Sequence, residues 1–182
     1  IRSAREPSDK LKNEITRFYE EGKFTEMLAL GRKLVKQFPA SNVGYKSLGA
    51  ALMRLGQRDK AEPYMLKALE HDPTDIDILS NYGLLRASRG DLVQAEVLLR
   101  RALHKAPGFM QAWFNLGLVM RSQARLEATE RAYLSALEVD GDNPEILLNY
   151  GALLVEFHRF IEAEQCVRKV LSLRPDYINA HI

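Results

Sequence analysis

The sequence predicts an all-α fold, a right-handed superhelical solenoid of tandem helix-turn-helix hairpins. Three observations support this prediction. Apolar residues recur at spacings of three and four, as they do on one face of a helix. Small residues and prolines recur at a fixed period of 34 residues. No segment has the alternating apolar and polar pattern that would compete as a strand.

Glycine marks the 34-residue period most clearly, because Gly49, Gly83, Gly117 and Gly151 stand one period apart, each after a Leu or a Tyr. Other columns keep the same register: Gly22, Gly56 and Gly90; Ala68, Ala102 and Ala136; and Pro39, Pro73, Pro107 and Pro175. The predicted organisation is an N-terminal extension (1–7), five repeats (8–41, 42–75, 76–109, 110–143 and 144–177) and the start of a sixth repeat (178–182).

Each repeat begins with a segment that reads as a first helix, here called the A helix. In the second repeat, Tyr45, Leu48 and Leu52 form a single apolar stripe. The glycine that follows Leu48 costs about 1 kcal/mol inside a helix, so it indicates a place where a neighbouring helix approaches closely. Gly56 then matches the preference for glycine just past a helix end.

The second half of each repeat reads as another helix, the B helix. Ala61 and Ala68 lie seven residues apart on one face of it and leave room for the A helix across the hairpin. A proline such as Pro73 then stops the B helix, because it lacks an N–H group.

Several positions depart from this pattern. The first repeat has Ile15, Met27 and Leu34 in place of small residues, and an extra Gly31, which is typical of the capping end of a solenoid. Later departures, expected to be slightly looser sites, are Ala124, Thr129, Gly141 and His158. The C-terminal end carries no polar cap, so a homo-oligomer through that end is possible.

The pattern Trp113-x2-Leu116-Gly117, with Gly90, Ala95, Ala102 and Pro107 in the preceding repeat, resembles the tetratricopeptide repeat, and the resemblance covers about nine tenths of the chain. It implies a scaffold that binds a protein or peptide partner. The stretch from Gly22 to Leu52 also resembles bacterial tetratricopeptide regions that precede glycosyltransferase, sulfotransferase or methyltransferase domains.

Composition argues against several other classes of function. The formal net charge of +2 gives no field for nucleic acid or an anionic membrane, and no apolar run approaches the ~20 residues of a membrane span. One cysteine and no signal peptide indicate a reducing, cytoplasmic location.

The sequence offers no candidate for catalysis. The four histidines have no metal-ligand spacing, Cys166 lacks a histidine partner, and no glycine loop opens a helix after a strand. We therefore predict no catalytic residue, no metal, no cofactor and no enzymatic activity.

One polar column stands out on the A helices: Asn13, Asn81, Asn115 and Asn149, with Ser47 at the same place in the second repeat. Helix interiors disfavour Asn, by up to ~0.7 kcal/mol relative to Ala. The column could tie neighbouring A helices together. Alternatively, each amide could donate to and accept from the backbone of a bound peptide. The column resembles the asparagine ladder of the O-linked N-acetylglucosamine transferases, which implies a concave binding groove.

Residues near the column on the A helices should share its face. The predicted groove is lined by Leu84, Phe114, Leu118, Arg121, Leu148 and Val155. The carboxylate clamp of chaperone-binding relatives is a poor match, because only Lys46 and Asn81 fit it, and we reject that specificity.

Three functional hypotheses follow. The chain is a module that binds an extended polypeptide, a non-catalytic arm that recruits substrates for a larger transferase, or a self-associating structural solenoid.

Overall fold

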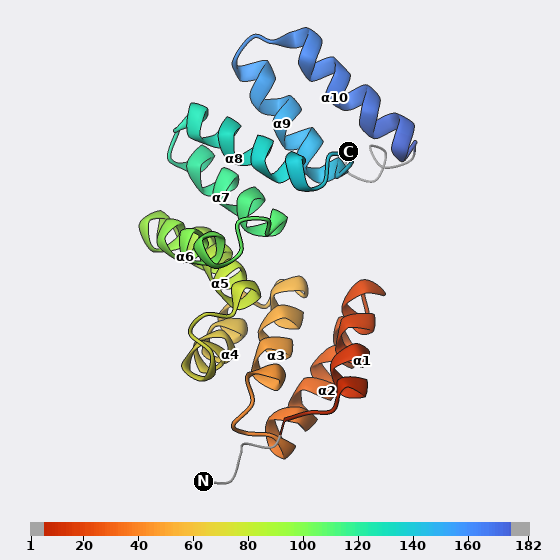
Figure 1. Cartoon of the computed structure of the whole chain (residues 1–182), viewed down its shortest axis with the longest axis vertical. Coiled ribbons are helices and arrows are strands. Elements are labelled where there is room, and N and C mark those ends of the chain that lie inside the picture. The colour runs from red at the N-terminus through yellow and green to blue at the C-terminus, as the bar shows by residue number, and fades with distance from the viewer. Residues whose placement is uncertain (1–5, 176–182) are drawn as a thin grey trace. The chain divides into compact units, whose positions relative to one another are not determined.

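A computed structural model describes residues 6–175 of the chain. Within this range the secondary structure is entirely α-helical, which confirms the predicted all-α fold of tandem hairpins (Figure 1). The helices are α1 (Asp9–Glu20), α2 (Phe24–Gln37), α3 (Asn42–Arg54), α4 (Arg58–His71), α5 (Ile76–Ser88), α6 (Leu92–Lys105), α7 (Met110–Ser122), α8 (Leu126–Val139), α9 (Pro144–Glu156) and α10 (Phe160–Leu173).

Four helices begin where the sequence places the start of a repeat. Helices α3, α5, α7 and α9 begin at Asn42, Ile76, Met110 and Pro144. The division into five repeats remains a prediction. The expected start of a sixth repeat at 178–182, and residues 1–5 of the predicted extension, lie outside the described residues.

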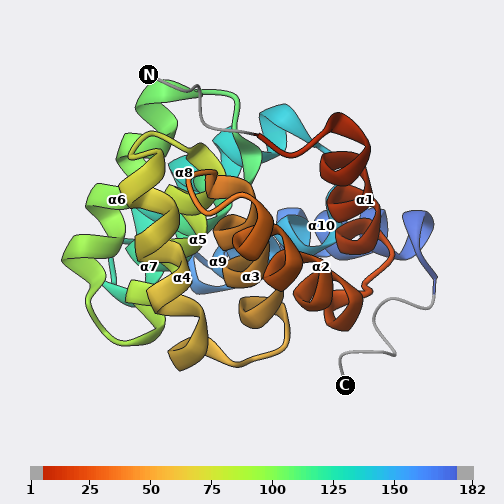
Figure 2. The ribbon, with the colours of Figure 1, turned by 90° about the horizontal axis from the view of Figure 1, so that it is seen from below.

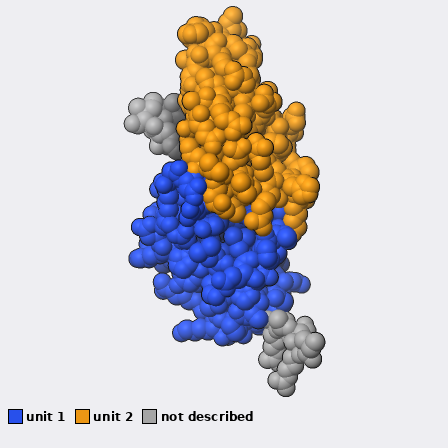
Figure 3. Space-filling model, turned by 90° about the vertical axis from the view of Figure 1, so that its left-hand side faces the viewer, with its two compact units in different colours: residues 1–91 blue, residues 92–182 orange. Residues whose placement is uncertain are grey.

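The chain forms two compact units, unit 1 (residues 1–91) and unit 2 (residues 92–182), which are coloured separately in Figure 3. In unit 1, α1 pairs with α2 and α3 pairs with α4. Helix α2 also packs along α3, and the two lie side by side in both ribbon views (Figures 1 and 2). In unit 2, α7 pairs with α8, α9 pairs with α10, and α6 packs on α7.

The turns between A and B helices share one backbone geometry. Gly22, Gly56 and Gly90 have φ values of 69°, 71° and 82°, in the left-handed region that glycine enters without strain. Ala124 and His158 adopt the same conformation, with φ values of 56° and 58°. The two substituted turns therefore keep the glycine geometry at the cost of backbone strain.

The glycines inside the A helices allow close packing to different degrees. A β-carbon at Gly117 would overlap the ring of Tyr133 on α8, whereas one at Gly151 would lie 3.4 Å from the Cβ atom of Cys166, an ordinary contact. At Gly49 the nearest atom would be the flexible Met65 side chain, with Cγ at 2.9 Å. Among Gly49, Gly117 and Gly151, glycine is thus sterically required most strongly at Gly117 in the α7–α8 hairpin.

The atypical Gly31 has a similar explanation. A β-carbon there would lie 3.0 Å from the Leu48 side chain and 3.4 Å from the Gly44 carbonyl oxygen. At Gly44 itself, a β-carbon would lie 2.8 Å from the Val35 backbone nitrogen. The two glycines let the backbones of α2 and α3 approach closely.

The small-residue columns of the B helices form much of the core. The predicted alanines are buried, as are the larger residues that replace alanine in the first repeat and the threonine in the fourth: Ala61, Ala68, Ala95, Ala102, Ala136, Ala163, Met27, Leu34 and Thr129. Thr129 satisfies its hydroxyl by donating to the Arg125 carbonyl oxygen at 3.0 Å. The B helices therefore present a closely packed face to the A helices.

Candidate functional site

The polar column on the A helices divides into accessible and buried members. Asn13 is exposed, and Asn81 and Asn149 are half-buried. Ser47 and Asn115 are only 2% and 1% exposed. Three of the five predicted residues can therefore meet a ligand directly in this conformation.

The hydrogen bonds of the column differ from one member to the next. Asn149 donates from Nδ2 to the Glu145 carbonyl oxygen of its own helix at 2.8 Å. Ser47 likewise donates to the Val43 carbonyl oxygen at 2.6 Å, and Asn115 accepts from Gln111 Nε2 at 3.1 Å. The contact of Asn149 uses one of its donor hydrogens, and an amide can still offer its other hydrogen and its oxygen to a ligand.

The apolar residues predicted beside the column also differ in exposure. Leu84, Leu118 and Leu148 are half-buried, and Val155 is 49% exposed. Phe114 is only 4% exposed, and its ring centroid lies 5.9 Å from that of Tyr133. Phe114 therefore packs in the core of unit 2 beneath this face.

That core joins the four helices α7, α8, α9 and α10 of unit 2. Its buried cluster consists of Phe114, Tyr133, Ala136, Ile146, Tyr150, Leu153, Leu154 and Ala163. Burial raises the pKa of Tyr133, while the nearby guanidinium of Arg121 acts in the opposite direction. The Tyr133 hydroxyl is buried and has no hydrogen-bond partner among the described residues.

Arg121, also predicted as a groove residue, forms an ion pair with Glu156. The pair connects the last turn of α7 to the end of α9. Both side chains are about a third exposed, at 34% and 38%. Glu156 directly follows the accessible Val155 in α9, and the ion pair is only partly desolvated.

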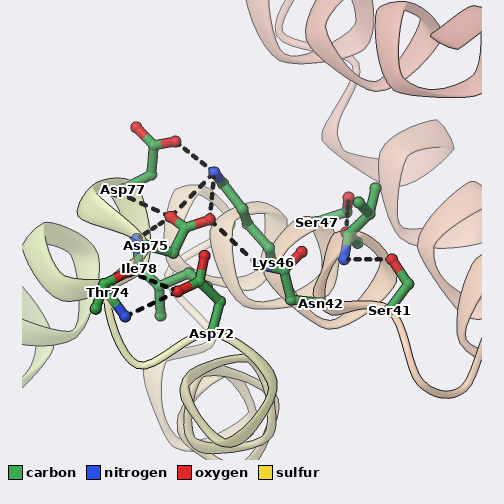
Figure 4. Close-up of polar contacts among 10 residues, drawn as sticks. Ser41, Asn42, Lys46, Ser47, Asp72, Thr74, Asp75, Asp77 and Ile78 are labelled. Carbon is green, nitrogen blue, oxygen red and sulfur yellow. Dashed lines mark hydrogen bonds and ion pairs between the residues drawn. The ribbon is translucent and has the colours of Figure 1, made fainter. Parts of the chain in front are cut away.

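Unit 1 contains a polar network at the junction of α3 and α5 (Figure 4). Lys46 Nζ donates to both carboxylate oxygens of Asp75, at 3.1 and 3.0 Å, and forms an ion pair with Asp77. Asp75 also accepts from Asn42 at 3.3 Å and from the backbone N–H groups of Asp77 and Ile78, so it caps α5. Figure 4 shows the Lys46 ammonium facing the carboxylates of Asp75 and Asp77.

The charges of this network favour the protonated form of Lys46. Burial alone would lower its pKa, but the hydrogen bond that Lys46 donates to Asp77 and the charges of Asp75 and Asp77 outweigh burial, so the pKa of Lys46 is raised. Lys46 is thus committed to two carboxylates of its own chain, which argues against its use as a clamp for a ligand carboxylate.

Sequence reasoning missed a column of glutamates with the same 34-residue period: Glu62, Glu96 and Glu130 on successive B helices. Each bonds to an arginine near the turn of the next hairpin. Glu62 pairs with Arg89, Glu96 pairs with Arg125 at 3.0 Å, and Glu130 pairs with Arg159. The period itself was a signal that could have found them.

Two tyrosines extend this glutamate column. Tyr82 donates its hydroxyl to Glu62 at 3.3 Å, and Tyr150 donates to Glu130 at 3.2 Å. Burial raises the pKa of both tyrosines, and the adjacent glutamate charge acts in the same direction. These contacts fasten hairpins within each unit, which is a structural role.

The part of the chain that the structure describes contains no group of three or more His, Cys, Asp or Glu side chains placed to hold a metal ion. None of the helices in residues 6–175 is both long and apolar enough to cross a bilayer. Cys166 is half-buried, and burial raises the pKa of its thiol. Such a thiol is a poor nucleophile at neutral pH.

Comparison with known sequences identifies the repeat. Residues 43–75 and residues 64–97 match two sequence profiles that are both described as the tetratricopeptide repeat (TPR). A TPR repeat-containing protein of Pseudomonas aeruginosa is 28% identical over 134 residues, covering 72% of this chain and 23% of that protein.

Two further relatives are named for different functions. The type IV pilus assembly protein PilF of Pseudomonas aeruginosa is 35% identical over 89 residues, covering 49% of this chain and 35% of PilF. Protein O-mannosyl-transferase Tmtc3 of Drosophila melanogaster is 29% identical over 155 residues, covering 65% of this chain and 17% of the transferase. The chain therefore spans between about a sixth and about a third of these relatives.

The solved structure of Pseudomonas aeruginosa PilF has the same fold. It superposes with a TM-score of 0.76 over 90% of this chain and 75% of the PilF chain, at 19% sequence identity. At this identity the similarity concerns the fold alone.

Proposed function

We propose that this chain, which belongs to the tetratricopeptide repeat family, is a protein-binding scaffold that holds an extended polypeptide along its A helices. Tetratricopeptide folds serve in general as interaction scaffolds. The finer proposal is that binding uses an asparagine ladder together with apolar contacts, and that the chain acts by binding and carries out no catalysis of its own.

The observation that carries this proposal is the partial exposure of Asn81 and Asn149 at the same position of their A helices. An amide side chain provides both a donor and an acceptor, as a peptide backbone does. A column of such groups can therefore bind successive backbone groups whatever the ligand sequence, as in other modes of extended-peptide recognition.

Each unit carries its own set of proposed ligand-binding residues. The accessible residues are Asn13, Asn81 and Leu84 in unit 1, and Leu118, Arg121, Leu148, Asn149 and Val155 in unit 2. Ser47, Asn115 and Phe114 belong to the same predicted set but are buried, so we assign them the role of holding the accessible residues in place.

The experiment selects ligands from a library of random twelve-residue peptides and then modifies the strongest binder in two ways. One series replaces each side chain with Ala, and the other methylates each backbone nitrogen. We expect several single N-methyl groups to weaken binding at least tenfold, because each removes a backbone donor, while most Ala replacements change affinity less than threefold. The opposite pattern would contradict recognition of the backbone.

A second candidate function is that of a substrate-recruiting arm of a larger transferase. It is favoured by the similarity to a protein O-mannosyl-transferase, of which this chain covers only 17%. The full reading frame tests it directly: a transferase domain encoded in the same frame would support this role, and a stop codon after further repeats would contradict it.

Self-association is the third candidate. Helix α10 exposes apolar side chains, of which Ile161 is 75% and Phe160 is 59% exposed. Light scattering over a range of protein concentrations tests this role. A concentration-dependent mass that the double variant Phe160→Glu/Ile161→Glu abolishes would support it, and a constant monomer mass would contradict it.

A further inference from the structure

Unit 1 contains a pocket that the proposed A-helix site does not use. The pocket, here called the α2–α4 pocket, has a volume of about 570 Å³ and opens between two B helices, α2 and α4. Leu28, Leu48 and Leu52 provide its apolar lining, and Tyr64 lines it from α4. Leu48 and Leu52 are 2% and 5% exposed, so they form the floor. Such a volume can hold one or two side chains of a ligand.

The mouth of the pocket is electropositive. Arg32 is exposed on α2 and makes no ion pair or hydrogen bond with any described residue. Lys60 donates to the amide oxygen of Gln57 at 3.1 Å, which leaves its charge uncompensated. Asp59 is the acidic lining residue, but it is paired with Arg89 at 2.9 Å. Two cations therefore flank an apolar cavity without a counter-charge of their own.

We propose that the α2–α4 pocket binds an aromatic side chain of an acidic peptide segment. The aromatic ring fills the cavity over Leu48 and Leu52 and packs against Tyr64, because aromatic rings gain most from burial and from ring–ring contact. Carboxylates on either side of the ring bind Arg32 and Lys60. Exposed ion pairs contribute little energy individually, so the ring supplies most of the affinity and the charges supply the selectivity.

This pocket is independent of the proposed peptide site on the A helices. None of its lining residues belongs to the asparagine column or to the apolar residues beside it. Either site can therefore be present without the other, and their tests have separate outcomes.

The probe is the peptide acetyl-Asp-Glu-Phe-Asp-Glu-amide, titrated into the full chain with ¹³C-labelled leucine methyl groups. We expect saturable shifts of the methyl signals of Leu28, Leu48 and Leu52. A peptide with Ala in place of Phe is expected to bind at least fivefold more weakly, because it leaves the cavity unfilled. A peptide with Lys at all four acidic positions is expected to cause no saturable shift.

The variants test the two cations. Arg32→Glu and Lys60→Glu should each weaken the probe at least fivefold, and Arg32→Gln and Lys60→Gln should weaken it less. Lys33→Glu is the matched control, since Lys33 is on the same helix but does not line the pocket. It should change the affinity less than twofold. Urea unfolding of each variant shows whether the fold is retained, and the Gln variants serve if a charge reversal unfolds the chain.

Four results would overturn the proposal. Equal loss of affinity in Lys33→Glu and Arg32→Glu would indicate a general electrostatic attraction. Equal affinity for the Phe and Ala peptides would mean that the pocket is not filled. Equal affinity for a single-stranded deoxythymidine dodecamer would indicate a surface for any polyanion. Absence of shifts in the three leucines at millimolar probe would contradict binding altogether.

Discussion

Two residues at the same position of the repeat link successive A helices in opposite ways. Lys46 on α3 of unit 1 and Phe114 on α7 of unit 2 are separated by two 34-residue periods. Lys46 bonds to Asp75 and Asp77 at the start of α5, the next A helix. Phe114 packs in a buried cluster that includes Ile146 of α9. One repeat framework therefore accepts either a polar or an apolar junction.

The two junctions should differ in strength. The Lys46 junction must offset the cost of partly desolvating an ammonium and two carboxylates, so its net contribution is small. The Phe114 junction gains from burial with no such cost. The polar junction has a different advantage: an ion pair with Asp75 specifies which side chain lies opposite, whereas an apolar cluster tolerates substitution of similar volume.

The largest expected effect is that of Phe114→Ala. Phe114 is 4% exposed within the core of unit 2, so its truncation should lower the free energy of unfolding by about 3–5 kcal/mol. Urea unfolding measures the change. A loss under ~1 kcal/mol would mean that the aromatic junction does not hold α7 to α9.

A smaller effect is expected at the helix A glycines, where two positions in one column should respond with opposite sign. Gly117→Ala should destabilise by about 2 kcal/mol, because its β-carbon would overlap the buried ring of Tyr133. Gly151→Ala should stabilise by about 0.5–1 kcal/mol, since the space is available and Ala favours helix. Urea unfolding of the two variants measures both changes. Equal changes in the free energy of unfolding at Gly117 and Gly151 would refute the steric explanation.

The polar junction is tested by Lys46→Met, which should cost about 1 kcal/mol at neutral pH after allowance for the partial exposure of the lysine. Folding raises the pKa of Lys46. Its ionic contribution to the free energy of unfolding is therefore complete below the pKa of an unfolded lysine, about 10.4, and is lost as pH rises through the pKa in the folded state. The difference between Lys46→Met and the parent should therefore shrink at alkaline pH. A constant difference from pH 8 to pH 12 would contradict the ionic account.

The smallest effect is expected at the turns. Ala124→Gly and His158→Gly should each stabilise by up to about 1 kcal/mol, because both residues have left-handed backbone angles that glycine adopts without strain. The greater freedom of glycine in the unfolded chain reduces this gain. Thermal unfolding of Ala124→Gly and His158→Gly measures this gain. Gly90→Ala, which we expect to be destabilised, serves as the comparison.

Much of the fold could be predicted because the repeat applies the same local rules many times. The column of Gly22, Gly56 and Gly90 predicted where the A helices end, and the buried Ala61 and Ala68 were predicted as a packing face. The period also placed Ala124 and His158 at turns, although the sequence could not tell that they would keep the glycine geometry.

The candidate site was less predictable, because exposure depends on how neighbouring helices pack. Asn115 and Asn149 occupy the same position in their repeats, yet Asn115 is 1% exposed and Asn149 is half-buried. Phe114 was predicted to line a groove and is 4% exposed in the core, where its ring packs against that of Tyr133. The network around Lys46 needs long-range contacts that no short sequence window contains.

The central claim, that the accessible asparagines bind a ligand backbone, is tested most directly by comparing two variants. Asn81→Ala/Asn149→Ala removes the half-buried amides, and Asn115→Ala removes a buried one. The affinity for the selected twelve-residue peptide and the free energy of unfolding are measured on both.

The double variant should bind about tenfold to thirtyfold more weakly, at about 1 kcal/mol per lost hydrogen bond, while its unfolding free energy is unchanged or higher. Asn115→Ala should instead lose stability, with little change in affinity among folded molecules. Unchanged affinity with clear destabilisation of the double variant would contradict the claim and assign the whole column to the packing of the A helices.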